Sequence, residues 1–345
     1  MNQILKFIFS IAVLSSVLFS CSNNDEENKM LMSISGNPGE VIFVTTTNQW
    51  KGKIGETIQS HFLKPVYGMP QDEPLFNVIQ TNKSDFDRIF QTFRNVVLIE
   101  IDTNRYSEGE VTYHKNAWAN GQLVIRVIAS SRDELIDIFN QNAAQMIHTI
   151  QAKEFNRLYA KYKRKPNKGI QEKLKKELQI EAVIPKEAVL ASHDDKHAWV
   201  RIEREKLKGG YQHQISQGLL IFKYPYRQKQ QFLDSNLFAL RDSILQAYIP
   251  GPSDGSYMTT EYRYYPPVTK EINYQDHFAK EIHGLWRMEN NFMGGPMATY
   301  FVLNEDEGMI YCFSGYAFAP QFNKREYYRE IESIARSIQF VSASK

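Results

Sequence analysis

The stretch GQLVIRVIASSRDELIDIFNQNAAQMIHTI, residues 121–150, carries the pattern that decides the fold. Residues 121–128 form an apolar run rich in β-branched side chains, which is typical of a buried strand. Ser131 then stands where a helix would have its N-cap. Apolar side chains recur beyond it at helical spacing: Leu135, Ile138, Phe139, Ala143, Met146 and Ile147. Because the apolar run gives way to a period of 3.6 residues, the stretch predicts a strand followed by an amphipathic helix.

The same order of strand, polar turn and helix recurs in other parts of the chain: residues 75–93, 218–245 and 308–338. Two units end in a long helix with an Ile-Gln pair, at residues 150–151 and 338–339, which suggests an internal duplication. Turn clusters such as residues 304–308 favour hairpins. We therefore predict an α+β fold of two halves, each a mostly antiparallel sheet with helices packed on one face.

The halves are predicted at residues 38–160 and 181–341, joined by a basic helical connector at residues 161–180. Ten Lys or Arg and two Glu lie within residues 151–176. Pro166 interrupts this run, so two short helices that meet at a turn are expected. Such clustered charge fits either a solvated helix pair that bridges the halves or a segment that lies against anionic lipid head groups.

The composition excludes several classes of protein. Hydrophobic residues make up 42% of the 345 residues, which is enough for real cores and unlike a disordered or collagenous chain. Two cysteines cannot build a disulfide framework. The 41 basic and 39 acidic side chains nearly cancel, so bulk charge gives no reason to expect nucleic acid as a partner.

Residues 1–20 have the pattern of a bacterial secretion signal peptide. Lys6 supplies the positive charge, and residues 7–19 carry no charge. As a helix this uncharged segment would rise about 20 Å, short of the hydrocarbon core of a bilayer at about 30 Å. A permanent transmembrane anchor is therefore not expected.

The end of this signal, Leu18-Phe19-Ser20-Cys21, resembles a lipobox. That resemblance implies that Cys21 becomes the first mature residue and carries acyl chains such as palmitate, which would anchor the protein to a membrane. Residues 21–37 would then form a flexible tether, and its acidic tract at residues 25–27 resembles the lipoprotein export signal of Bacteroidetes. The predicted location is the outer membrane, facing the periplasm or exported to the cell surface. A plain secretory signal with an incidental cysteine is the alternative.

The chain lacks the motifs of the commonest serine hydrolases, zinc proteases, nucleotide enzymes and thiol oxidoreductases. His193 and His197, with Asp194 and Asp195 between them, are the nearest candidates for metal ligands. The same residue types are typical of a polar loop that leads into a strand, so no metal site is assigned and no cofactor is predicted. Cys312 stands in an apolar run and is expected to be a small buried residue.

Aromatic residues gather in the second half, where residues 181–345 hold 26 Phe, Tyr or Trp against 15 in residues 21–180. Five residues there are candidates for a ligand-binding surface: Tyr262, Tyr264, His283, Trp286 and Arg287. In an extended strand the two tyrosines would share a face, about 7 Å apart. With the tryptophan they would form a platform for stacking, and the histidine and arginine would be its polar partners. The alternative is that these rings pack in the core.

Two short stretches near these aromatics, Trp286-Arg287-Met288 and Met293-Gly294-Gly295-Pro296, carry a wider resemblance. Together with the signal, the lipid cysteine and the acidic tether, they resemble an uncharacterised family of Bacteroidetes lipoproteins, a domain of unknown function. This resemblance covers nearly the whole mature chain and implies no activity. The way each half ends, with a strand that runs into a final long helix, is similar to PsbP- and Mog1-like folds, at the level of the fold alone.

These observations favour a non-enzymatic binding or accessory lipoprotein of the cell envelope, whose partner is a glycan, a peptide or another protein. Two alternatives stay open. One is a structural subunit of an envelope complex that uses the basic connector or an exposed sheet edge. The other is an envelope hydrolase with a site around His193, His197 or His283 that follows no common motif. The predicted partners are a membrane, through the lipid, and an envelope ligand, with no nucleic acid.

Overall fold

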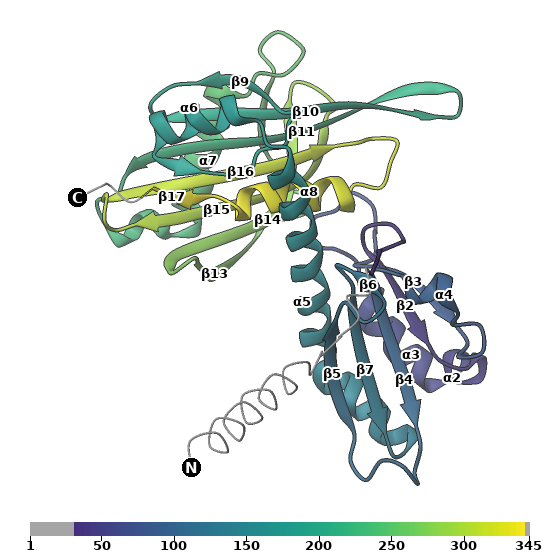
Figure 1. Ribbon diagram of the computed structural model, residues 1–345. Coiled ribbons are helices and arrows are strands. Elements are labelled where there is room, and N and C mark those ends of the chain that lie inside the picture. Colours follow the sequence, from purple (N-terminus) through teal and green to yellow (C-terminus); the bar gives the residue numbers. More distant parts are fainter. Residues whose placement is uncertain (1–30, 342–345) are drawn as a thin grey trace, which may run out of the picture.

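The computed structural model describes residues 31–341. The predictions for the signal peptide, for Cys21 and for the first part of the tether concern residues outside that range. The described chain contains helices and strands in several sheets, so the predicted α+β class is confirmed. Figure 1 shows two halves joined by the long helix α5 (Arg132–Arg164). Each helix within residues 31–341 is too short or too polar to cross a bilayer.

The first half is built on a five-stranded sheet with the strand order β3-β2-β4-β7-β5. Its elements before α5 are β1 (Met32–Ser33), β2 (Glu40–Val44), α2 (Thr47–Lys51), α3 (Lys53–Phe62), β3 (Asn77–Thr81), α4 (Arg88–Gln91), β4 (Asn95–Ile101), β5 (Glu110–Lys115), β6 (Ala119–Asn120) and β7 (Leu123–Ala129). The strands β3, β2, β4 and β7 pair in parallel, and β5 pairs with β7 in the antiparallel direction. A short parallel pair, β1 with β6, lies beside this sheet.

The prediction of a mostly antiparallel sheet is therefore wrong for the first half. Hydrophobic periodicity reports whether a segment is a strand or a helix, and it carries no information on strand direction. The hairpin signal came from residues 304–308, which belong to the other half. In the first half, helices connect β2 to β3 and β3 to β4 instead, and such crossovers produce parallel pairs.

Both faces of the five-stranded sheet are covered. Val41 and Phe43 of β2 pack with α3 and α5, whereas Ile42 and Val44 pack on the side of α4. Strands that are buried on both faces read as unbroken apolar runs, which explains why β2 shows no alternation of polar and apolar residues. Helices on both faces make this half doubly wound, which corrects the prediction that helices cover one face.

The second half is built on an eight-stranded sheet with the order β12-β14-β15-β16-β11-β10-β9, in which β13 also pairs with β14. Its elements are α6 (Lys168–Leu178), β8 (Ile180–Glu181), β9 (Val189–His193), β10 (His197–Lys208), β11 (Tyr211–Pro225), a short 3-10 helix (Lys229–Phe232), α7 (Asp234–Tyr248), β12 (Tyr257–Thr260), β13 (Val268–Tyr274), β14 (His277–Glu289), β15 (Gly294–Asn304), β16 (Met309–Phe318), α8 (Arg325–Arg336) and β17 (Gln339–Phe340). The pairings within this sheet are antiparallel, so the prediction is confirmed for this half.

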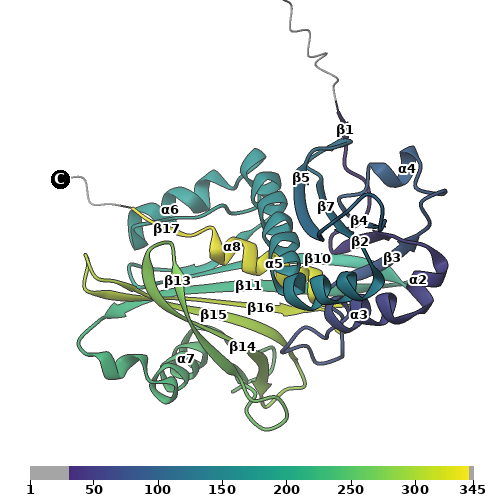
Figure 2. The ribbon, with the colours of Figure 1, turned by 90° about the horizontal axis from the view of Figure 1, so that it is seen from below.

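Helices lie on both sides of the large sheet as well. Figure 2 shows α6 and α8 on one side and α7 on the other. Ile331 and Ile334 of α8 pack into one core, and Leu237 and Leu245 of α7 pack into a second core on the opposite face. The prediction of helices on one face is therefore wrong here too. The halves also differ in strand order and direction, which contradicts an internal duplication.

Helix α5 belongs to both halves. Its N-terminal part, including Phe139 and Met146, packs in the core of the first half, whereas Tyr162 near its end packs in the core of the second half. The predicted turn of the basic connector lies between the end of α5 at Arg164 and the start of α6 at Lys168. The first helix of that connector is not short, because it is the end of the 33-residue α5.

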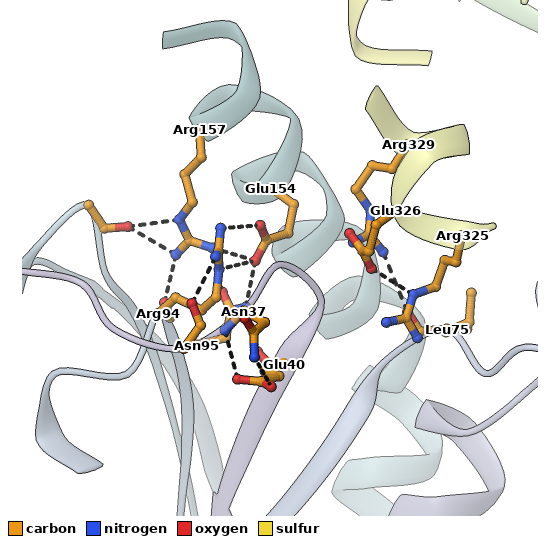
Figure 3. A network of polar contacts seen from close by, with 12 residues as sticks. Asn37, Glu40, Leu75, Arg94, Asn95, Glu154, Arg157, Arg325, Glu326 and Arg329 are labelled. Carbon is orange, nitrogen blue, oxygen red and sulfur yellow. Dashed lines mark hydrogen bonds and ion pairs between the residues drawn. The ribbon is translucent and has the colours of Figure 1, made fainter. Parts of the chain in front are cut away.

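A buried ion network fixes α5 to the first sheet (Figure 3). The carboxylate of Glu154, 1% exposed, accepts hydrogen bonds from Arg94 (2.7 Å and 2.9 Å), Asn95 (2.8 Å) and Arg157 (2.6 Å). Arg157 also donates to the carbonyl oxygens of Arg94 and Gly121. Because a buried carboxylate is stable only when it is paired, this network fixes α5 against the start of β4, the central strand of the sheet.

The loop after α3 joins the halves at the start of α8. The buried carboxylate of Glu73 accepts hydrogen bonds from the backbone N–H groups of Lys324 (2.6 Å) and Arg325 (2.8 Å). These groups lie at the N-terminus of α8, where backbone donors lack partners within the helix. Arg325 and Arg329 donate in turn to the carbonyl oxygens of Pro74 and Leu75. A residue of the first half thus caps the last helix of the second half.

Candidate functional site

The best candidate for a ligand site is a cavity on the α7 face of the large sheet, which we call the aromatic pocket. Its volume is about 500 Å³. Four aromatic side chains line it: Trp199, Trp286, Tyr316 and Phe318. Three methionines, Met258, Met288 and Met293, and the loop 249–252 complete the apolar lining. The pocket lies where the sheet extends beyond the end of α7.

The alternation of strands explains how these side chains come together. Residues two apart on a strand point to the same face, so Trp286 and Met288 of β14 share a face, as do Tyr316 and Phe318 of β16. Trp199 contributes from β10 in the same way. Trp286 contacts both β16 rings, with centroid distances of 5.4 Å to Tyr316 and 6.2 Å to Phe318. These contacts make the floor of the pocket a packed aromatic cluster.

Two glycines in the strands make room for the rings. Gly218 pairs with Tyr316 across β11 and β16, and a Cβ at Gly218 would lie 2.3 Å from the tyrosine ring. Gly295 pairs with Trp286, and a Cβ there would lie 2.1 Å from the carbonyl oxygen of Ala317. Any larger residue at either position would displace the backbone or a ring of the pocket.

Hydrogen bonds fix the rings at the floor. The indole N–H of Trp286 donates to the carbonyl oxygen of Ala317, and that of Trp199 donates to the hydroxyl of Tyr316, both at 3.2 Å. Burial raises the pKa of the Tyr316 phenol to about 12, so this residue is neutral at physiological pH. The floor of the pocket is therefore uncharged and held in one arrangement.

The polar side chains at the rim of the aromatic pocket all contact one carboxylate, that of Glu203. Glu203 pairs with Arg201 at 2.5 Å and accepts hydrogen bonds from Gln214 (3.2 Å) and Ser216 (2.8 Å). The guanidinium of Arg201 also lies 5.0 Å from the centroid of the Trp199 ring. Since Arg201, Gln214 and Ser216 are the polar side chains that line the pocket, its donors are largely satisfied without a ligand.

The structure divides the five residues that the sequence suggested as a platform. Trp286 is 1% exposed and lines the aromatic pocket. His283 lies three residues earlier on β14, an odd separation, and its ring reaches Tyr328 of α8 on the opposite face. Arg287 lies on the same face of β14 as His283 and pairs with Glu261 and Glu289. The prediction of one shared exposed surface is therefore wrong.

The two tyrosines of that prediction also lie apart from the tryptophan. They follow the end of β12 at Thr260 and do not lie in a strand. Tyr262 packs its ring against Phe238 of α7 and donates a hydrogen bond to Asp242 at 2.7 Å. Tyr264 is 84% exposed. Trp286 is thus a core residue, Tyr262 contacts a helix and Tyr264 lies on the surface, although the sequence pattern groups the three together.

His283 belongs to a buried cluster of titratable groups. One ligand-type atom each of Glu281, His283 and Glu332 lies within 4.8 Å of the others. The hydroxyl of Tyr328 donates to the carbonyl oxygen of Met297, so at 2.5 Å it accepts from Nδ1 of His283. Nε2 of His283 lies 3.1 Å from Glu281. Both ring nitrogens thus face acceptors, which is the arrangement of a protonated imidazole.

The charges of this cluster balance without a metal ion. Arg336 pairs with Glu281 at 2.7 Å, and its guanidinium would repel a divalent cation bound by that carboxylate. Burial alone would raise the pKa of Glu281, but His283 and Arg336 outweigh it and lower that pKa to about 2. Burial alone would lower the pKa of His283, but Glu281 and Glu332 raise it. We therefore interpret the cluster as an ion network that holds α8 on the sheet.

The weaker metal candidates, His193 and His197, do not converge on one point. His193 lies 2.7 Å from Glu177 of α6, whereas His197 lies 3.1 Å from Ser192 and stacks on Tyr248 of α7 at 3.9 Å. They do not form a three-ligand group with any other residue in the described range. Cys312 is fully buried and free, as expected, and burial raises the pKa of its thiol.

Sequence reasoning missed most of the aromatic pocket. Trp199 lies in a segment that the sequence predicts as a strand, whereas Tyr316 and Phe318 lie in the last part of β16, beyond the apolar run at residues 308–313. The spacing of two between Tyr316 and Phe318 is a usable signal of a shared face. The three residues come together because β10 and β16 both pair with β11, and the pairing of β11 with β16 joins residues about 100 positions apart in the chain. Spacing alone does not reveal such partners.

The fold and the pocket define an α+β protein of two halves. Comparisons with known protein families give one match for each half. Residues 34–163 match the model of a domain of unknown function, DUF8532, and residues 166–337 match that of another, DUF4837. The chain thus consists largely of two domains of unknown function. No curated protein matches it. Among solved structures, a mutant of the protein Mog1 is similar at 10% identity and a TM-score of 0.30, over 47% of this chain and 91% of that chain. A likeness this distant carries no argument about function.

Proposed function

We propose that this chain is a lipid-anchored protein of the cell envelope that binds a ligand in the aromatic pocket without catalysis. The anchor is Cys21, at the end of the secretion signal, and the location is the outer membrane, facing the periplasm or the cell surface. The observation that carries the proposal is the pocket itself, an open cavity of about 500 Å³ that the second half builds from rings and methionines. Cavities of this size and lining hold organic ligands in other proteins.

The lining favours an apolar ligand, and we propose a peptide segment that inserts a large apolar side chain. A sugar would bring many hydroxyl groups that need directed partners, and each unsatisfied group would cost about 1–3 kcal/mol. Glu203 already engages Arg201, Gln214 and Ser216, so the pocket offers few free partners. Methionines adapt to apolar side chains of different shapes, and three of them line this pocket.

A substitution at the mouth of the pocket tests this proposal. Met293 lines the pocket, and its neighbour Phe292 on the same hairpin is fully exposed and does not. Met293→Asp should weaken the binding of peptides that carry Trp, Phe or Leu at least about tenfold, because it places a charge at an apolar contact. Phe292→Asp is the matched control and should bind as the unaltered protein does.

Binding can be followed by tryptophan fluorescence, because Trp199 and Trp286 line the pocket. Saturation by the peptides, with loss in the Met293 variant only, supports the proposal. Saturation by oligosaccharides alone would replace the peptide with a glycan. Equal binding in both variants, or no binding of either ligand class, would refute the pocket as the site.

The anchor is tested separately by metabolic labelling with a fatty acid. Cys21→Ala should abolish the label and release the protein from the membrane fraction. Cys312→Ala, at the only other cysteine, is the control and should keep the label. Label that persists on the Cys21 variant would refute the lipid anchor.

A further inference from the structure

The first half contains a second cavity, at a position that follows from its topology. From β2 the chain goes to β3 on one side of the sheet order and then returns to β4 on the other side of β2. The first connection contains α3, which packs on the α5 face, and the second contains α4, which lies on the opposite face. The connections that leave the carboxyl ends of the adjacent strands β2 and β3 therefore lie on opposite faces of the sheet. In doubly wound sheets, the crevice at such a point, at the carboxyl ends of the strands, is where ligands bind.

A cavity of about 200 Å³ lies at this crevice. Thr45 and Thr46, directly after β2, line it on one side, and Asp102 and Arg105, directly after β4, line it on the other. Lys83 reaches it from the segment after β3. Because β3 and β4 flank β2 in the sheet, Lys83 and Arg105 approach the loop after β2 from opposite sides.

The acidic groups of this cavity are already engaged. Glu100 pairs with Arg126 at 2.8 Å and accepts a hydrogen bond from Tyr106 at 2.5 Å. Burial alone would raise the pKa of Glu100, but these partners lower it, so the carboxylate stays ionised and satisfied. Asp102 accepts hydrogen bonds from the backbone N–H groups of Asn104 and Arg105.

The basic groups of this cavity, in contrast, still have hydrogen-bond donors and charge available for a ligand. Lys83 has no ion pair or hydrogen bond to another residue within 31–341, and the guanidinium of Arg105 comes no closer than 4.0 Å to Glu100. Arg126 is committed to Glu100. Two cations, on either side of the strand end, thus remain open to a ligand at this crevice.

We propose that this crevice binds a small organic anion, whose carboxylate or phosphate group lies between Lys83 and Arg105. The volume of about 200 Å³ equals the share of six or seven water molecules, at about 30 Å³ each, so the ligand is far smaller than a nucleotide. This site is separate from the aromatic pocket, which lies in the other half, and it does not rest on the function proposed for that pocket.

Calorimetric titration of the whole chain with inorganic phosphate and with succinate tests this proposal. One saturable site is expected for at least one of the two anions, and which anion binds decides between phosphate and carboxylate ligands. Lys83→Ala and Arg105→Ala should each weaken that binding at least about tenfold, as the loss of one ionic hydrogen bond does. Both side chains are exposed, so the variants should keep their melting temperature.

Matched controls come from exposed basic residues of the same half that do not line the cavity. Lys115→Ala and Arg132→Ala should bind the anion within about twofold of the unaltered protein, because surface substitutions away from a site have small effects. Met293→Asp in the aromatic pocket should also leave it unchanged, so the two proposals can fail independently. No saturation by either anion below about 10 mM, or equal weakening in the controls, would overturn the proposal.

Discussion

The two faces of the large sheet receive their helices in different ways. On one face, α8 is held at its N-terminus by Glu73 of the first half and near its C-terminus by Arg336, which lies 5.1 Å from the ring of Phe155 on α5. On the other face, α7 packs on the sheet alone and ends at Tyr248. The first face buries an ion network, and the second face leaves the aromatic pocket open.

Element lengths explain the difference. The 15-residue helix α7 is about 22 Å long, whereas the 15-residue strand β11 can reach about 50 Å. A strand therefore outruns a helix of equal residue number, and the sheet beyond α7 has no helix to cover it. On the α8 face, residues of the first half reach across and complete the cover. A ligand site is to be expected on the α7 face, where no residue of the first half within the described range covers the sheet.

The strongest test of this comparison is at the floor of the open face. Trp286→Ala should destabilise the protein by about 3–5 kcal/mol, because it removes a buried ring that packs against Tyr316 and Phe318. Tyr264→Ala, at a residue that is 84% exposed, is the control and should stay within about 0.5 kcal/mol. Thermal melts measure both. Equal losses would show that the floor of the pocket is not a core.

The next largest effect is expected at the cap between the halves. Glu73→Ala should cost about 2 kcal/mol, because it removes a charged acceptor from two backbone N–H groups at the start of α8. Its exposed neighbour serves as the control, and Asp72→Ala should be nearly neutral. Urea denaturation of both variants measures the difference. A Glu73 variant as stable as the control would mean that α8 does not depend on the first half.

A smaller effect is expected within the core under α7. Cys312→Ser should cost about 1–2 kcal/mol, because it buries a hydroxyl where the thiol packs among apolar groups. The same melts measure it, together with peptide binding by fluorescence. A variant that keeps full stability but no longer binds the peptide would show that the Cys312 thiol takes part in binding and is not only a packing residue.

The smallest effect concerns the closed face and depends on pH. The pKa of His283 is raised above its ordinary 6.5, so the stability that its charge contributes is complete below pH 6.5 and is lost as the pH rises through the folded-state pKa. The melting temperature should therefore fall above pH 6.5 in the unaltered protein. In His283→Gln this part of the pH dependence should disappear. An identical pH profile in both proteins would contradict the protonated state of His283.

The sequence predicts whether a segment is a helix or a strand better than it predicts how the strands are arranged in the sheets. The strand and helix at residues 121–150 are β7 and the start of α5, because their apolar periodicity is a local property. The direction of β2, β3 and β4 depends on which helices connect them, and it could not be read from strand patterns. The antiparallel second half was predictable from turns such as residues 304–308.

The candidate site shows the same limit. The sequence points to Trp286 because aromatic residues gather in the second half, but its separation of three from His283 places the two residues on opposite faces of a strand. Trp199 and Tyr316 come from β10 and β16, which lie on either side of β11 in the folded sheet, so their hydrogen bond has no local signal in the sequence. Tyr262 and Tyr264 were assigned to a strand that ends earlier, at Thr260.

Helix α5 has a consequence for the ancestry of the chain. The boundary between the two matched domains falls at its end, between residues 163 and 166, yet Tyr162 packs in the core of the second domain and Phe139 in that of the first. A gene fragment that encoded the second domain alone would lack part of its own core, and one that stopped before Glu154 would leave Arg94 buried without its partner. Recombination that separates the two coding regions would therefore produce incomplete proteins.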